Sequence, residues 1–454
     1  MEGPGLKDIL TGKYGDKAKI GALVEMAMND KLPYPFIKNT IDPKLKFNNL
    51  RKFTPTILES QYKISGHNNQ NNLYHNWKGG DLVSDPENSY DDYNIILDYY
   101  TEIERSKSSA SGSISSFDSW SDRTIVKKVM TEIVKNHKKG GKMPTLRDFS
   151  DALYNQVKRP GLFRPTWLKG IFWILYKGKY PKDLNILNMS SGWGSELMIS
   201  LVLGYSYLGF DPNKKLKPGH DAMIVDFGNV KKQKVIYEPF ENYDLGKLKF
   251  DIAVTSPPFY DKEIYSSGEQ SIDTYSDFSS WMVGFLFQYI SNAWYSIKVG
   301  GYLIIHMSDI RGREINNPMN LYIEQFLKNS SWVKMVGVSF SKNAGYPVWI
   351  WQKKNGALNK WNRKRKRKFS TLYPSLFDKI IMGYVRTLTT EPKKSTILEL
   401  ALADVSPDVV NYARDTVFRE NYKVEYIVNH SKNTKTAKET IRKIALFAYY
   451  SENT

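Results

Sequence analysis

The segment TSPPFY at residues 255–260 contains the residue types best suited to chemistry in this chain. It directly follows an apolar run, so we expect a buried strand that ends in a rigid turn. Pro257 and Pro258 fix φ and supply no N–H donor, so their carbonyls and the Ser256 hydroxyl can all face one guest. The exocyclic amine of adenine or cytosine suits such acceptors, and Phe259 can stack on the extruded base. A polyproline turn without this role is the alternative.

A second motif lies upstream, where the sequence NMSSGWG occupies residues 188–194 between an apolar pair and an apolar helical stretch. A strand, a glycine turn and a helix in this order let backbone N–H groups approach a carboxylate or phosphate. Asp211 ends the next apolar segment, 17 residues beyond Gly194, close to the roughly 20 residues expected before a ribose-binding acid. The alternative for Asp211 is a turn cap before Pro212.

Together these segments resemble the class I S-adenosylmethionine-dependent methyltransferases, and among them the DNA methyltransferases that modify adenine N6 or cytosine N4. The resemblance covers about residues 160–355. It implies an α/β fold with a doubly wound, mixed, seven-stranded Rossmann-like sheet, S-adenosylmethionine as cofactor and no metal. It implies cofactor contacts from Pro165, Thr166, Asn188, Ser190, Gly192, Gly194, Asp211, Asn213 and Phe240, and a catalytic site at Ser256, Pro257, Pro258 and Phe259.

The chain departs from this family at several positions. Asn188 stands where the family carries an acidic residue that contacts the cofactor amino group, and Ser190 replaces an aromatic residue. Ser256 is commoner in N4-cytosine than in N6-adenine enzymes, and Phe259 replaces a tyrosine while keeping its stacking face. Two alternatives therefore stay open: a catalytically reduced subunit that binds nucleic acid or serves a structural role, and a methyltransferase that acts on RNA.

Composition limits the remaining possibilities. The chain has 454 residues, of which 41% are hydrophobic, so it can bury a large core in two or three domains. It contains no cysteine, which excludes disulfides, zinc–thiolate sites and a cysteine nucleophile. No apolar run approaches the roughly 20 residues needed to cross a bilayer. We expect a soluble, intracellular protein without membrane contact, compatible with a nucleus or viral factory in a eukaryotic host.

The net charge of +18 favours a polyanionic partner, because cations that neutralise phosphates release counterions. Double-stranded DNA is the favoured partner, and a protein partner or a homodimer stays open. Lys262, just after the catalytic turn, is a candidate phosphate contact. Six consecutive cations form the strongest basic feature: Arg363, Lys364, Arg365, Lys366, Arg367 and Lys368. A nuclear-import signal or a solvated linker is the alternative for this run.

The sequence suggests five regions along the chain. Residues 1–105 are polar, with short helical patterns and no readable role, and 106–122 form a serine-rich linker or exposed loop. The methyltransferase domain is expected over 123–355, followed by a basic linker at 356–372 and a helical C-terminal region at 373–454. The N-terminal and C-terminal regions are both expected to be mainly helical.

Overall fold

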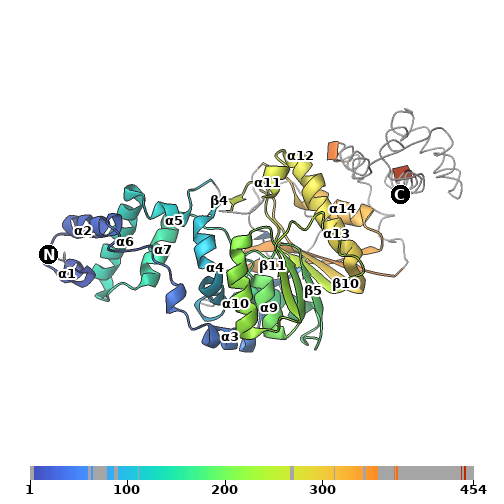
Figure 1. Ribbon diagram of the computed structural model, residues 1–454, viewed down its shortest axis with the longest axis horizontal. Helices are drawn as coiled ribbons and strands as arrows, with labels where there is room; N and C mark the ends of the chain where they lie inside the picture. The colour runs from blue at the N-terminus through green and yellow to red at the C-terminus, as the bar shows by residue number, and fades with distance from the viewer. Residues whose placement is uncertain are drawn as a thin grey trace.

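The computed structural model describes residues 5–59, 63–64, 79–85, 90–110, 112–265, 270–310, 312–340 and 344–355, and beyond these only 373, 375–376, 441 and 444–445. A sheet with helices on both faces forms the centre of the molecule, and a helical bundle extends from it at the N-terminal end (Figure 1). The basic run at 363–368 and nearly all of the expected C-terminal helical region lie outside the described residues.

The central sheet has ten strands within the described residues, in the order β1-β3-β11-β12-β10-β8-β5-β6-β7, with β2 paired to β12. The strands of its core are β5 (Asn185–Asn188), β6 (Ser206–Phe210), β7 (Gln233–Ile236), β8 (Phe250–Thr255), β10 (Ile297–His306), β11 (Ser330–Ser339) and β12 (Ala344–Lys353). Strand β12 is antiparallel to both β10 and β11, and the other core strands are parallel. The expected doubly wound, mixed, seven-stranded Rossmann-like sheet is therefore confirmed as the core of this larger sheet.

Alternating side chains divide the sheet into two buried faces. Ile252 and Val254 of β8 belong to one hydrophobic core, whereas Ala253 between them belongs to the other. This follows from the two-residue period of a strand, and nearly continuous apolar runs are typical of strands covered on both faces. One face is covered by α8 (Pro165–Leu175), α9 (Ser195–Leu203) and α10 (Lys217–Phe227), and the other by η5 (Trp281–Phe287), α13 (Gln288–Ser296) and α14 (Asn316–Phe326).

The described part of the N-terminal region is mainly helical, as expected, and it also extends the sheet. Strand β3 (Gly79–Ser84) runs parallel to β11, and β1 (Thr56–Glu59) is antiparallel to β3. The buried Lys169 amine of α8 donates to three backbone carbonyls at the end of α3 (Pro43–Lys52), which satisfies acceptors that a helix end leaves open. The sequence does not reveal these strands because pairing with a distant strand gives no local signal.

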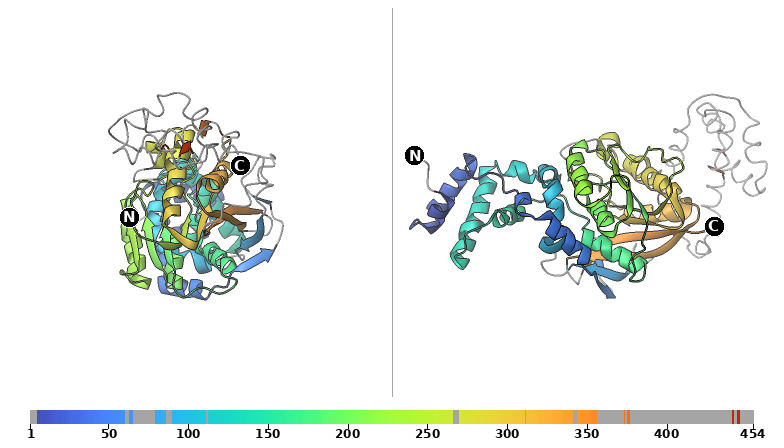
Figure 2. Two further views of the ribbon diagram at one scale, coloured as in Figure 1. Left: turned by 90° about the vertical axis from the view of Figure 1, so that its right-hand side faces the viewer. Right: turned by 60° about the horizontal axis from the view of Figure 1, so that its bottom comes forward.

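A helical bundle with its own core extends from the central sheet at the N-terminal end of the chain (Figure 2). It consists of α1 (Leu6–Thr11), α2 (Asp16–Met28), α5 (Ser116–Ser119), α6 (Arg123–Gly140) and α7 (Leu146–Gln156). Asp122 caps α6 and Thr145 closes a capping box at the start of α7. Helices α6 and α7, which the sequence groups with the catalytic domain, thus pack in one core with α1 and α2.

The serine-rich segment is not the exposed connector that its composition predicted. Ser106, Ser108 and Ser116 are buried, and Ser116 bonds to both the Tyr34 hydroxyl at 2.9 Å and the Ser106 carbonyl at 3.1 Å. Small hydroxyl side chains can be buried when each finds a partner, so their composition alone did not decide exposure. The strand β4 (Ser109–Ala110) within this segment pairs with β9 (Glu263–Ile264), which follows the turn 256–259 in the chain.

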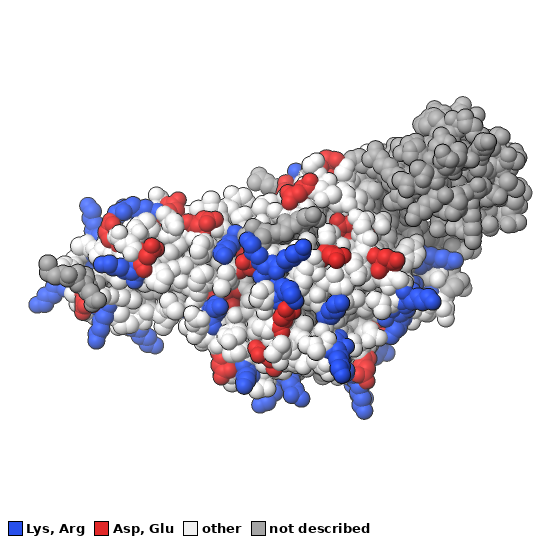
Figure 3. Space-filling model, viewed as in Figure 1, with Lys and Arg blue, Asp and Glu red and all other residues white. Residues whose placement is uncertain are grey.

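The visible surface carries both signs of charge. On the face in Figure 3, Lys and Arg lie over the helical bundle and over the sheet domain, with Asp and Glu among them. Among the described helices, none has both the length and the apolar composition required to span a bilayer.

Candidate active site

A cavity of about 480 Å³ lies at the carboxyl ends of β5, β6, β8 and β10. The chain order reverses between β5 and β8, and ligands of open α/β sheets bind at such a crevice. The volume lies within the roughly 300–1,000 Å³ typical of small-molecule sites. The predicted residues that meet on its wall are Ser190, Gly192, Asp211, Asn213, Phe240, Ser256, Pro257, Pro258, Phe259 and Lys262.

Four predicted residues are not brought to the cavity wall: Pro165, Thr166, Asn188 and Gly194. The buried Thr166 hydroxyl instead contacts Asp85 Oδ1 at 2.6 Å and Asn94 Oδ1 at 3.1 Å. Gly194 has φ +88°, and a Cβ there would lie 2.8 Å from the end of Met223. A glycine is needed there so that the helix start can pack closely against α10. Thr166 and Gly194 therefore pack behind the residues that line the cavity and do not line it themselves.

The glycine turn is held by polar contacts from three other elements. Asp211 Oδ2 accepts from the Gly192 N–H at 2.7 Å, and Oδ1 accepts from the Asn213 N–H at 2.9 Å. His220 Nε2 lies 3.0 Å from the Gly192 carbonyl, and the Thr101 hydroxyl donates to the Trp193 carbonyl at 3.2 Å. Burial raises the pKa of Asp211 to about 6, although both backbone bonds oppose this shift. The N-terminal helix α4 (Ile96–Lys107), whose sequence indicates no role, thus supports the turn.

A buried carboxyl group lies beside the asparagine that departs from the family pattern. Glu196 occupies the first turn of α9 and lines the cavity, and the Asn188 side chain hydrogen-bonds it. Asn188 also accepts from the Ser190 N–H at 2.9 Å and donates to the Tyr207 hydroxyl at 3.1 Å. Burial raises the pKa of Glu196 to about 8, although hydrogen bonds from its own backbone N–H and from the Asn188 side chain oppose this shift. Sequence reasoning missed Glu196, although an acidic residue just after a glycine turn was a usable signal.

Tyr289 of α13 lines the cavity and connects the two motifs. Its hydroxyl lies 2.7 Å from Ser190 Oγ and 2.7 Å from Thr255 Oγ1. The ring is buried, and burial raises the pKa of its hydroxyl well above the ordinary value. Tyr289 therefore fixes the end of β5 relative to the end of β8 through neutral hydrogen bonds. No local motif marks this tyrosine in the sequence.

The turn at residues 256–259 is followed by a residue in the left-handed conformation. Tyr260 has φ +51°, a conformation that costs a non-glycine residue roughly 1–2 kcal/mol. Its hydroxyl donates to the Ser276 carbonyl at 2.6 Å, and its ring packs edge-on against Trp281 at 5.6 Å. The Arg313 guanidinium lies 4.6 Å from the same ring. These contacts hold the chain in its tight path directly after Phe259.

His306 lies beside Ser256 at the end of β10. Its Nδ1 lies 3.0 Å from Ser256 Oγ, and its ring stacks on Phe163 with centroids 4.6 Å apart and an interplanar angle of 12°. Burial lowers the pKa of His306 to about 3, and the nearby charge of Lys262 acts in the same direction. The imidazole is therefore neutral at physiological pH.

Three cationic side chains reach the cavity, two from the segment after α7 and one from the loop after the turn 256–259: Lys158, Arg159 and Lys262. The Lys262 ammonium lies 5.0 Å from the Phe259 ring centroid, and burial lowers its pKa. The neighbouring Glu263 accepts from the Gly161 N–H at 2.9 Å and from the Tyr265 hydroxyl at 2.8 Å. These bonds and the β4–β9 pairing hold the loop against the segment after α7.

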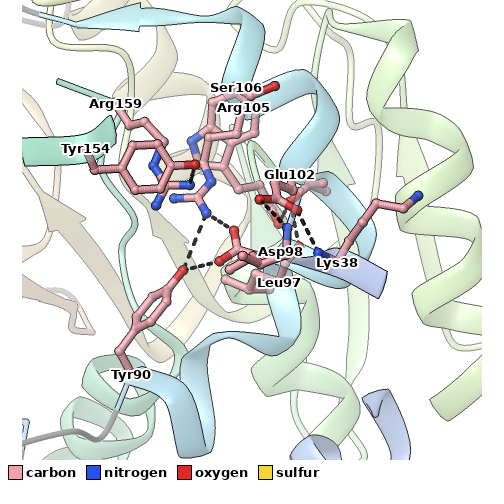
Figure 4. A network of polar contacts seen from close by, with 12 residues as sticks. Lys38, Tyr90, Leu97, Asp98, Glu102, Arg105, Ser106, Tyr154 and Arg159 are labelled. Atoms are coloured by element: carbon pink, nitrogen blue, oxygen red, sulfur yellow. Dashed lines mark hydrogen bonds and ion pairs between the residues drawn. The ribbon is translucent and has the colours of Figure 1, made fainter. Parts of the chain in front are cut away.

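Two groups of polar contacts lie close together near the cavity, one between Tyr90 and helix α4 and one between Tyr154 and Arg159 (Figure 4). Arg105 forms an ion pair with Asp98, which also accepts from the Tyr90 hydroxyl at 2.6 Å. Arg159 donates to the Tyr154 hydroxyl. Removing one partner of the buried Arg105–Asp98 pair would leave an uncompensated charge near Arg159.

Comparison with known proteins gives only distant similarities. No family model and no curated protein matches the chain. Similar solved structures include an rRNA methylase from Streptococcus thermophilus (13% identity, TM-score 0.30, 43% of this chain and 100% of that chain). A Streptococcus mutans structure in complex with S-adenosylhomocysteine (SAH) has 14% identity and a TM-score of 0.31, and the match covers 42% of this chain and 99% of that chain. A methyltransferase from Pyrococcus furiosus has 14% identity and a TM-score of 0.29, and the match covers 42% of this chain and 83% of that chain. At these scores the fold assignment rests on the chain's own strand order and directions.

Proposed function

We propose that this protein transfers a methyl group from S-adenosylmethionine to the exocyclic amine of a nucleic-acid base, cytosine N4 or adenine N6, with DNA as the favoured substrate. The observation that carries the proposal is the meeting of the glycine turn, Asp211 and the turn 256–259 in one cavity. Each was predicted from a separate stretch of sequence. Their shared cavity supports a single ligand that is held by the glycine turn and Asp211 and faces the turn 256–259.

The cavity residues fit the cofactor. Gly192, with φ +47° and open space where a Cβ would project, leaves room for a ligand against the backbone. Asp211 lies at the cavity wall for ribose hydroxyls, and Phe240 offers a face for the adenine. We assign to Glu196 the contact with the cofactor ammonium that Asn188 does not provide. When bound, the cofactor supplies an electrophilic methyl group on a sulfonium.

The turn 256–259 would act mainly by positioning the amine. Ser256 Oγ and a proline carbonyl accept its two N–H bonds, which directs the nitrogen lone pair out of conjugation with the ring. Phe259 stacks on the base and, with Phe163 and Trp167, gives the pocket aromatic walls that exclude water. Correct placement of two reacting groups supplies a large part of catalysis in such sites.

Charge supports a nucleic-acid substrate. Lys158, Arg159 and Lys262 line the cavity, and the chain has a net charge of +18. Cations beside a pocket for a flipped base can contact the flanking phosphates. RNA presents the same phosphates and amines, so it is tested alongside DNA.

The second candidate is a catalytically reduced subunit that binds nucleic acid. It is favoured by Asn188, which takes the place of the family's acidic residue and is hydrogen-bonded within the protein. This candidate predicts nucleic-acid binding without methyl transfer. The proposed enzyme predicts both.

The test combines binding and product analysis. Calorimetry with SAH is followed by incubation of DNA and RNA with labelled S-adenosylmethionine and mass spectrometry of the released nucleosides. We expect N4-methylcytosine or N6-methyladenine, and Pro257→Ala should abolish it while keeping SAH affinity. Pro144→Ala, in the loop before α7, is the matched control. Folded wild-type protein that binds nucleic acid but neither binds SAH nor transfers methyl groups would establish the second candidate.

A further inference from the structure

The relation between Ser256 and His306 follows from the sheet register. Ile305 of β10 pairs with Thr255 of the parallel strand β8, so the next residue of each strand emerges at the same edge of the sheet. The side chains of Ser256 and His306 meet there, with Oγ and Nδ1 3.0 Å apart. Both residues line the cavity.

The second ring nitrogen of His306 has aromatic surroundings. Nε2 is buried and has no hydrogen-bond partner among the described residues. The ring stacks on Phe163, and Phe259, Trp167 and Tyr346 lie with ring centroids 5.9, 6.4 and 6.5 Å away. An N–H is attracted to the negative face of an aromatic ring, whereas a lone pair directed there is repelled. The surroundings therefore favour the tautomer with the proton on Nε2.

This tautomer decides the direction of the hydrogen bond to the serine. With the proton on Nε2, Nδ1 has a lone pair, and the Ser256 hydroxyl must donate to it. A serine hydroxyl can otherwise rotate to donate or accept. Once its proton is held by His306, Ser256 presents only lone pairs to the cavity.

We propose that His306 is a positioning and specificity-determining residue that holds Ser256 as a hydrogen-bond acceptor, so that the site takes a base with an amino group and rejects one with a carbonyl at that position. The inference rests on the proposed function and deepens it. A cytosine or adenine amine donates to Ser256. Uracil and hypoxanthine carry an oxygen there, which meets the serine lone pairs with no donor between them.

The experiment measures competition in the methylation assay. Oligonucleotides with uracil or hypoxanthine at the target position compete with the cytosine or adenine substrate, for wild type and for His306→Phe, His306→Asn and Ser256→Ala. In wild type the carbonyl bases should compete poorly. In His306→Phe the serine can rotate and donate, so their competition should strengthen by about tenfold while turnover falls. His306→Asn, which offers an amide oxygen near the Nδ1 position, should restore discrimination.

The control is His137→Phe on α6, a histidine that does not line the cavity. It should leave both the turnover and the competition by carbonyl bases unchanged. The double variant Ser256→Ala/His306→Phe should be no slower than Ser256→Ala alone, because His306 acts through the serine. Additive losses in turnover, or unchanged discrimination in His306→Phe, would overturn the inference. Wild type that binds SAH and methylates no base overturns the proposed function instead, so the two failures are distinct.

Discussion

Replacement of Glu196 by glutamine gives the sharpest test of how this cavity holds a cofactor. The carboxyl group lies buried at the cavity wall beside Asn188 and has a pKa raised to about 8 by burial. A ligand ammonium binds the ionised form, so binding must release the proton that Glu196 carries. Affinity for SAH should therefore rise with pH in wild type and stay nearly flat in Glu196→Gln.

The size of the effect follows from the pKa. With a value of about 8, roughly 1% of Glu196 is ionised at pH 6 and about half at pH 8. Affinity should then increase on the order of 50-fold over this range, or about 2.3 kcal/mol. Asp211, with a pKa raised to about 6, adds a smaller rise near pH 6, which Glu196→Gln retains. Burial keeps the hydroxyls of Tyr207 and Tyr289 neutral throughout, because it raises the pKa of each.

The assay is isothermal calorimetry at pH 6, 7 and 8, in two buffers of different ionisation enthalpy at each pH. At pH 7 wild type should release close to one proton on binding SAH, and Glu196→Gln markedly fewer. Methylthioadenosine, which lacks the ammonium, should bind both proteins alike. Asn188→Asp in the Glu196→Gln background returns a carboxylate to the neighbouring position and should recover affinity. Identical pH profiles for wild type and Glu196→Gln would refute the assignment.

Three further predictions concern the substrate and the fold. Phe259→Ala should weaken capture of the base by about 1–3 kcal/mol in substrate competition, whereas Phe259→Tyr should retain it; equal losses in both would contradict stacking. Changing Lys158 and Lys262 to glutamine should lower the salt dependence of nucleic-acid binding, seen as a shallower slope of affinity against salt; an unchanged slope would exclude them as phosphate contacts. Lys169→Met should lower the free energy of unfolding by about 3 kcal/mol, because three carbonyls lose a buried donor; denaturant midpoints equal to wild type would contradict this.

The sequence by itself determined the sheet and its two motifs. Apolar runs of strand length ending in a glycine turn and in Ser-Pro-Pro-Phe predicted β5, β6 and β8, because burial on both faces leaves a continuous apolar signal. It also indicated that Asp211 and Ser256 would meet, since the carboxyl ends of parallel strands share one edge. Thiol chemistry is excluded by composition alone, because the chain contains no cysteine.

Only the tertiary structure decided which groups complete the site. Glu196, Tyr289 and His306 act through contacts between different elements of the fold, and no local motif marks Tyr289 in the sequence. The same holds for the N-terminal strands and for the buried serines near 106–119, whose exposure depends on partners supplied by other segments. Local sequence encodes periodicity and turn chemistry, whereas burial, tautomer and pKa arise when side chains from different elements share one enclosed space.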